Sequence, residues 1–84
     1  MDTLSLWERY VARLCLDAWA LDPAALIKVM SHIESLIATG YVTDASITTV
    51  LRLAGVQHAD AELMAPTIRS TIEDDGVPPH AYPP

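Results

Sequence analysis

Residues 4–20, LSLWERYVARLCLDAWA, decide the fold class of this chain. Ser5 and Glu8 form a capping-box pattern, in which each side chain satisfies a free backbone N–H in the first turn of a helix. Apolar residues then recur at three- and four-residue spacing, which predicts an amphipathic helix with one buried face. These residues are Trp7, Tyr10, Val11, Leu14, Ala18 and Leu21.

The apolar sector of this helix is wider than one buried face requires. Cys15, Leu16 and Trp19 extend it over more than half of the circumference. Trp7 and Trp19 are separated by about 120° around the helix, because each residue turns it by about 100°. One small core cannot receive both rings, so we expect Trp19 to face a partner.

Further helices follow, each marked by residues that begin or end a helix. Asp22 is a good N-cap, and Pro23 suits the first helical position because its missing N–H has no partner there. Gly40 ends this second helix because glycine tolerates positive φ. Thr43 is the N-cap of a third helix, which ends at Gly55.

The second half of the chain is less regular. Residues 45–50 include four β-branched side chains, so a strand is the alternative there. Asp60 caps a fourth helix, and Pro66 lies inside its pattern, which predicts a kinked helix or two short ones. Residues 73–75 are acidic and lie at the unfavourable end of the helix macrodipole, so we expect fraying there.

The fold predicted from these patterns is all-α, with three to four short helices in an open bundle or an extended hairpin. We expect a helical association domain over residues 1–76. Residues 77–84, VPPHAYPP, contain four prolines and predict an extended, disordered tail that a partner can order.

The composition excludes several classes of protein. Hydrophobic residues make up 51% of the chain and charged residues 19%, which is too apolar for a disordered protein. The net charge of −6 disfavours binding to nucleic acid or to an anionic membrane surface. No apolar run reaches the about 18 residues of a membrane span, and the N-terminus lacks a basic signal-peptide region. With one free cysteine, the chain is expected in the cytoplasm.

The polar residues predict no active site and no metal site in this chain. His32, His58 and His80 lack the i, i+4 spacing that places two ligands on one helix face. Cys15 lies in an apolar helix, where burial makes a thiol inert. The pair Asp74-Asp75 is expected to be solvated. Docking on another protein is therefore the function that the residues favour.

A second pattern runs through residues 6–36, LWERYVARLCLDAWALDPAALIKVMSHIESL. A Trp-Glu dipeptide opens a long helix, and a second helix follows after a short turn. The residues that carry the pattern are Trp7, Glu8, Val11, Leu14, Leu16, Glu34, Ser35 and Leu36. In these features the stretch resembles the N-terminal helical region of nitrile hydratase β subunits. Nitrile hydratase activator proteins and one subunit of thiocyanate hydrolase share this region.

The resemblance implies a small non-catalytic subunit of a multi-chain nitrile hydratase, which adds water to a nitrile to give an amide. Its partners would be an α-like subunit that holds cobalt(III) or iron(III) and a separate chain equivalent to the C-terminal half of a β subunit. This chain itself would hold no cofactor. The alternatives are an activator, or metallochaperone, of the α subunit and a helical interaction module unrelated to nitriles.

One departure from the family concerns Ile33. The family usually places an arginine there, next to the matched Glu34, and this arginine hydrogen-bonds the oxidised cysteine ligands of the metal. An isoleucine cannot donate that bond, so the role is missing or lies elsewhere. The residues expected to face a partner are Trp7, Tyr10, Leu16, Trp19, Ile33, Glu34 and Tyr82.

Overall fold

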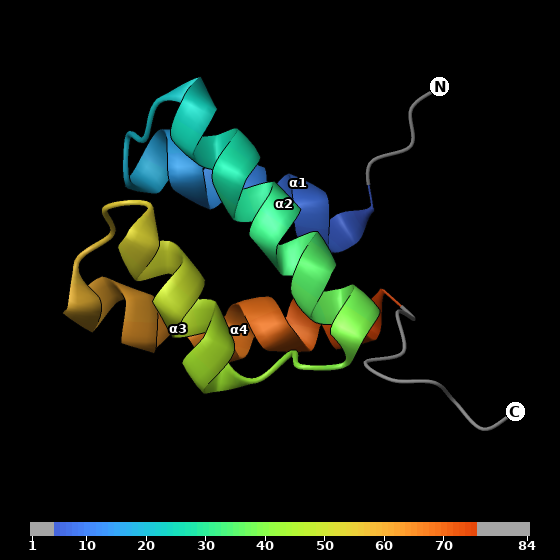
Figure 1. Ribbon diagram of the computed structural model, residues 1–84. Coiled ribbons are helices and arrows are strands. Elements are labelled where there is room, and N and C mark those ends of the chain that lie inside the picture. The colour runs from blue at the N-terminus through green and yellow to red at the C-terminus, as the bar shows by residue number, and fades with distance from the viewer. Residues whose placement is uncertain (1–4, 76–84) are drawn as a thin grey trace, which may run out of the picture.

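The computed structural model describes residues 5–75, and this part of the chain is all-α, as predicted (Figure 1). The helices are α1 (Leu6–Arg13), α2 (Pro23–Thr39), α3 (Asp44–Leu53) and α4 (His58–Asp74), and α1 continues into a short π-helix, η1 (Leu14–Ala18). Residues 45–50 belong to α3, so the alternative of a strand there is wrong. The predicted proline-rich tail, residues 77–84, lies outside the described residues.

Helices α2 and α3 begin and end at the residues that the sequence marks. The Asp22 carboxylate accepts a hydrogen bond from the Ala25 N–H at 2.9 Å, and the Thr43 hydroxyl accepts one from the Ser46 N–H at 3.0 Å. Each bond satisfies a backbone donor that has no partner inside the helix. Gly40 ends α2 with a φ of 80°, in the left-handed region that favours glycine.

The first helix changes geometry part-way along its length. It begins with the predicted contact of Ser5 and Glu8, in which the Ser5 N–H donates to Glu8 Oε1 at 2.8 Å. From Leu14 the backbone is π-helical, and the Trp19 N–H donates to the Leu14 carbonyl at 3.0 Å. Ala20 then has a φ of 52°, a conformation that costs a non-glycine residue about 1 kcal/mol. The predicted first helix is therefore a short α-helix with a π-helical end.

Two predictions about α4 are wrong, namely the N-cap at Asp60 and the alternative of two short helices divided at Pro66. The helix begins at His58 after the N-cap Gln57, and Asp60 lies in its first turn. It also continues through Pro66, because burial of one face offsets the about 3 kcal/mol that a proline costs inside a helix. The buried residues of α4 are Ala61, Ala65, Ile68 and Ile72.

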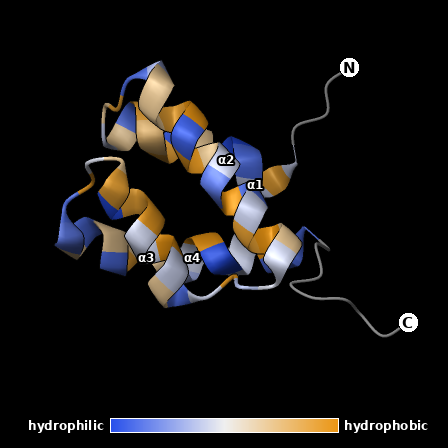
Figure 2. Cartoon of the chain, viewed as in Figure 1, coloured by the Kyte–Doolittle hydropathy of each residue, from blue (hydrophilic) through white to orange (hydrophobic). Residues whose placement is uncertain are grey.

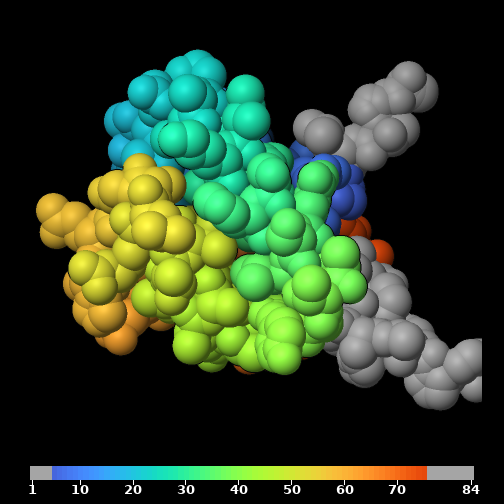
Figure 3. Space-filling model, in the orientation of Figure 1, coloured from blue at the N-terminus to red at the C-terminus, as the bar shows by residue number. Residues whose placement is uncertain are grey.

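Each of the helices contributes to one core. Successive helices reverse direction, α3 and α4 share the most extensive helix–helix contact, and α4 also packs on α1 (Figure 1). Helix α2 packs on α3, α1 and η1. Every helix carries hydrophobic and hydrophilic residues (Figure 2), and side chains fill the space between the ribbons (Figure 3). The buried residues outside α4 are Trp7, Val11, Cys15, Val29, Ile33, Val42, Ile47, Val50, Leu51 and Val56.

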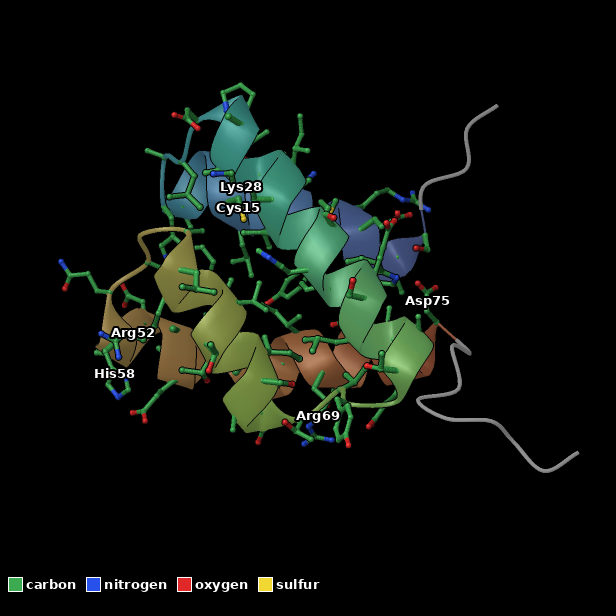
Figure 4. All side chains as sticks on the ribbon, in the orientation of Figure 1. Cys15, Lys28, Arg52, His58, Arg69 and Asp75 are labelled. Carbon is green, nitrogen blue, oxygen red and sulfur yellow. The ribbon has the colours of Figure 1, made fainter. Side chains whose placement is uncertain are left out.

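The two ends of the described chain meet. The Asp75 carboxylate accepts a hydrogen bond from the Trp7 N–H at 3.1 Å, across 68 positions of sequence. Figure 4 shows Asp75 where α4 ends beside the beginning of α1. A carboxylate is favourable at the N-terminus of a helix and unfavourable at the C-terminus, so this contact places the charge where α1 stabilises it.

Candidate functional site

Two of the residues expected to face a partner lie in the interior of the chain. Trp7 is 4% exposed and Ile33 is fully buried, and both pack in the shared core. A protein that docks on the folded surface does not reach either side chain. The position at which the resembled family has its arginine therefore points into this chain's own core.

The other expected residues divide between the core margin and the surface. Tyr10 and Trp19 are half-buried and pack against the core with one side. Leu16 is 44% exposed, and Glu34 is exposed on α2. Tyr82 lies outside the described residues. Tyr10 and Leu16 lie on the first helical segment, so the accessible candidates gather mostly there.

A recess among the described residues lies along α1 where α4 packs on it. Its volume is about 380 Å³. Leu6, Arg9, Tyr10 and Arg13 line it from α1, and Thr71 lines it from α4. We call this recess the α1–α4 groove. Each of the four α1 residues lies three or four positions from two of the others, so they share one face of the helix.

The α1–α4 groove is a local basic site on an acidic chain. The chain has five Lys and Arg against eleven Asp and Glu, and Arg9 and Arg13 are two of those five. Within residues 5–75 neither of them forms an ion pair, whereas Arg69 pairs with Asp44 and Glu73. Like charges at i, i+4 destabilise a helix by about 0.2–0.5 kcal/mol. The two guanidinium groups thus repel each other and are free to meet external carboxylates.

The floor of the groove is apolar. Leu6 is 49% exposed, and half-buried Tyr10 lies between the two arginines in sequence. Tyr10 was expected from the sequence to face a partner, whereas Arg9 and Arg13 were not among the residues expected to do so. Their i, i+4 repeat on both sides of Tyr10 is the signal that would have pointed to them. The contribution of Thr71 has no local signal, because it depends on α4 packing beside α1.

A second, smaller recess of about 240 Å³ lies between α2 and α3. It contains Lys28 and the side chain of Leu53, which is 72% exposed. The rest of its lining consists of Asp22, Ala24, Ala25 and Ala54. It lacks an aromatic side chain and carries one positive and one negative charge, so it selects a ligand less sharply than the α1–α4 groove does.

Cys15 is the one cysteine of the chain, and it is buried, as predicted. Burial raises the pKa of its thiol to about 11, because the low-polarity surroundings disfavour the thiolate. The thiol therefore stays protonated near neutral pH, where it is a poor nucleophile. Figure 4 shows its sulfur beneath α2, on the inner side of η1.

The histidines and carboxylates of the described part do not gather. Within residues 5–75 no three side chains of His, Cys, Asp or Glu lie close enough to hold a metal ion. His58 contacts Glu62 at 3.0 Å on exposed surface, and His32 is exposed on α2. No helix in this range is long and apolar enough to cross a membrane.

Comparison with known proteins adds no assignment. No protein-family model, no curated protein and no solved structure matches this chain. The likeness of residues 6–36 to nitrile hydratase β subunits therefore stays a hypothesis.

Proposed function

We propose that this chain is a small non-catalytic binding subunit that holds a segment of a larger protein in the α1–α4 groove. One observation carries the proposal: the groove combines exposed apolar surface with two arginines that have no ion-pair partner within residues 5–75. Burial of apolar surface contributes about 25 cal/mol per Å². Guanidinium groups add direction, because they bind carboxylates in a fixed geometry.

Exposed apolar side chains outside the groove carry less weight. Single exposed leucines are ordinary on a protein surface, because polar atoms do not suffice to cover it. The groove differs from them because it combines a recess, an aromatic ring and two positive charges one helical turn apart. The large apolar side chains exposed elsewhere are Leu16, Ile27, Tyr41, Leu53 and Leu63.

A more specific form of the proposal rests on the resemblance of residues 6–36. In this form the chain is a nitrile hydratase subunit that packs on an α-like subunit carrying cobalt(III) or iron(III), together with a chain like the C-terminal half of a β subunit. Helix α1, which lines the groove, carries the matched Trp7-Glu8 motif in its first turn. The free Cys15 suits a reducing compartment, so we place the assembly in the cytoplasm.

In that assembly the metal would belong to the partner. Residues 5–75 bring together no set of ligands, and buried Ile33 cannot reach a neighbouring metal site. The chain would instead cover the partner's metal pocket and exclude bulk water from it. An activator that accompanies the α subunit during metal insertion is the alternative, because it would use the same docking surface transiently.

Co-expression with an α-like nitrile hydratase subunit tests the specific form. A subunit elutes with the α-like chain in fixed stoichiometry on size exclusion and is required for nitrile hydration. An activator is dispensable once the metal is inserted. If the chain elutes alone and neither metal insertion nor turnover depends on it, the nitrile hydratase form is wrong, and only the unrelated interaction module remains.

A further inference from the structure

Taking the proposed binding function as given, we infer that the α1–α4 groove binds an acidic amphipathic helix of the partner. This helix carries two carboxylates one turn apart and an apolar side chain between them. The carboxylates pair with Arg9 and Arg13, and the apolar side chain packs on Leu6 and Tyr10. The inference names the partner's chemistry, which the proposed function leaves open.

Charge supports an acidic occupant. An arginine stays protonated throughout the physiological range, so the groove is permanently cationic. A basic segment would be repelled by both guanidinium groups. An acidic segment would be repelled by the remainder of a chain whose net charge is −6, so it is favoured at this groove over other surfaces.

Spacing defines the pattern of carboxylates. Arg9 and Arg13 stand at i and i+4 on α1, so their Cβ atoms are about 5–6 Å apart. Glutamates at i and i+4 of a second helix have the same separation. Each guanidinium then meets one carboxylate, and the helix turn between the glutamates faces Tyr10 and Leu6.

The surroundings of the groove favour a helical occupant over an extended one. An extended peptide gains affinity by adding its backbone to the edge of a sheet, but the elements of residues 5–75 are all helices. Helices α1 and α4 instead form two neighbouring walls. A third helix packs between such walls by inserting side chains at i, i+3 and i+4.

The test uses a displayed library of peptides of about 16 residues, long enough to hold a helix in water. The bait is the full 84-residue chain. We expect enriched peptides to carry Asp or Glu at i, i+4 beside Leu or an aromatic residue and to become helical on binding. Their affinity should fall as salt rises, because exposed charge pairs are screened.

Two double variants locate the binding site. Arg9→Glu/Arg13→Glu reverses the charge of the groove, and Lys28→Glu/Arg52→Glu makes the same change of net charge on exposed α2 and α3 positions. Circular dichroism confirms the fold of each. We expect the first variant to weaken the enriched peptides at least about tenfold and the second less than about twofold, since net charge alone acts only at long range.

The inference is overturned if the enriched peptides are basic or uncharged, if both double variants bind them equally, or if no peptide is enriched. Co-expression separates this failure from failure of the proposed function. A partner that binds the unmodified chain and both double variants equally leaves the binding function intact but refutes the groove. Absence of any partner together with absence of enriched peptides refutes both.

Discussion

The hydrogen bond between Asp75 and Trp7 gives the sharpest test of the structure. It joins the end of α4 to the beginning of α1, with 3.1 Å between the Trp7 backbone nitrogen and Asp75 Oδ2. Trp7 lies in the first turn of α1, where a backbone N–H has no partner inside the helix. Replacement of Asp75 by alanine removes the acceptor and leaves this donor without a protein partner.

The cost of Asp75→Ala is the difference between two effects. Loss of a side-chain acceptor at a helix N-terminus destabilises a protein by about 0.5–2 kcal/mol. Removal of a negative charge from the C-terminal end of α4 raises the free energy of unfolding by about 0.3–1 kcal/mol. We expect a net loss of about 0.6 kcal/mol in the free energy of unfolding, which lowers the Tm of a domain of this size by about 2–5 °C.

Asp74→Ala is the matched control. Asp74 is the neighbouring residue, has the same charge at the same helix end, and is exposed, and within residues 5–75 its carboxylate forms no hydrogen bond and no ion pair. Its removal should leave the Tm unchanged or raise it slightly. Thermal and urea unfolding, followed by circular dichroism, measures both variants. Equal stability of the two would refute the helix-joining role of Asp75.

Three further predictions concern the core, the backbone and the thiol. Ile33→Ala should cost about 2–5 kcal/mol in urea unfolding and Ile27→Ala at most about 0.5, because Ile33 is buried and Ile27 is 68% exposed; similar costs would contradict the placement of Ile33. Ala20→Gly should stabilise the chain by up to about 0.5 kcal/mol in the same assay, because relief of the about 1 kcal/mol strain at a φ of 52° outweighs the about 0.5–1 kcal/mol that the greater freedom of glycine in the unfolded chain costs. A lower Tm would argue against that conformation. The pKa of Cys15 rises from 9.0 to about 11, so native stability is lost as pH rises above 9, where only the unfolded thiol ionises. At pH 8 this shift lowers the thiolate population about 100-fold, and rapid labelling of the native chain by a thiol reagent would contradict it.

Local sequence signals were sufficient to predict the ends of helices where the residue that begins or ends a helix acts on its near neighbours in sequence. The N-caps at Asp22 and Thr43 and the end of α2 at Gly40 were predicted because each depends on contacts within about five residues. The π-helix from Leu14 was not predicted, because a segment of five residues is too short to establish an apolar period of its own. Passage of α4 through Pro66 also depends on tertiary packing that local propensity omits.

The candidate site was predictable only in part for the same reason. The sequence identified α1 as apolar beyond one face, and Tyr10 and Leu16 are accessible there. It misplaced Trp7 as a possible docking residue, because an isolated pattern cannot tell which side of a helix meets the core. The groove itself exists because α4 packs along α1, and the Thr71 wall comes from a residue more than fifty positions away.

The same packing links stability to binding. The two walls of the α1–α4 groove belong to the helices that Asp75 joins. The groove is therefore incomplete in the fraction of molecules in which this junction is open. Apparent affinity falls in proportion to the population of the competent state. The about 0.6 kcal/mol expected for Asp75→Ala therefore weakens binding of an enriched acidic peptide by at most about threefold.

Fluorescence anisotropy with one enriched peptide measures this coupling, with Asp74→Ala as the control. We expect Asp75→Ala to bind more weakly than Asp74→Ala, even though Asp75→Ala removes a negative charge that would repel the peptide. Long-range electrostatics alone predicts no difference between the two variants, because loss of either carboxylate should strengthen binding equally. Equal or stronger binding by Asp75→Ala, with a lowered Tm, would show that the junction stabilises the fold without shaping the groove.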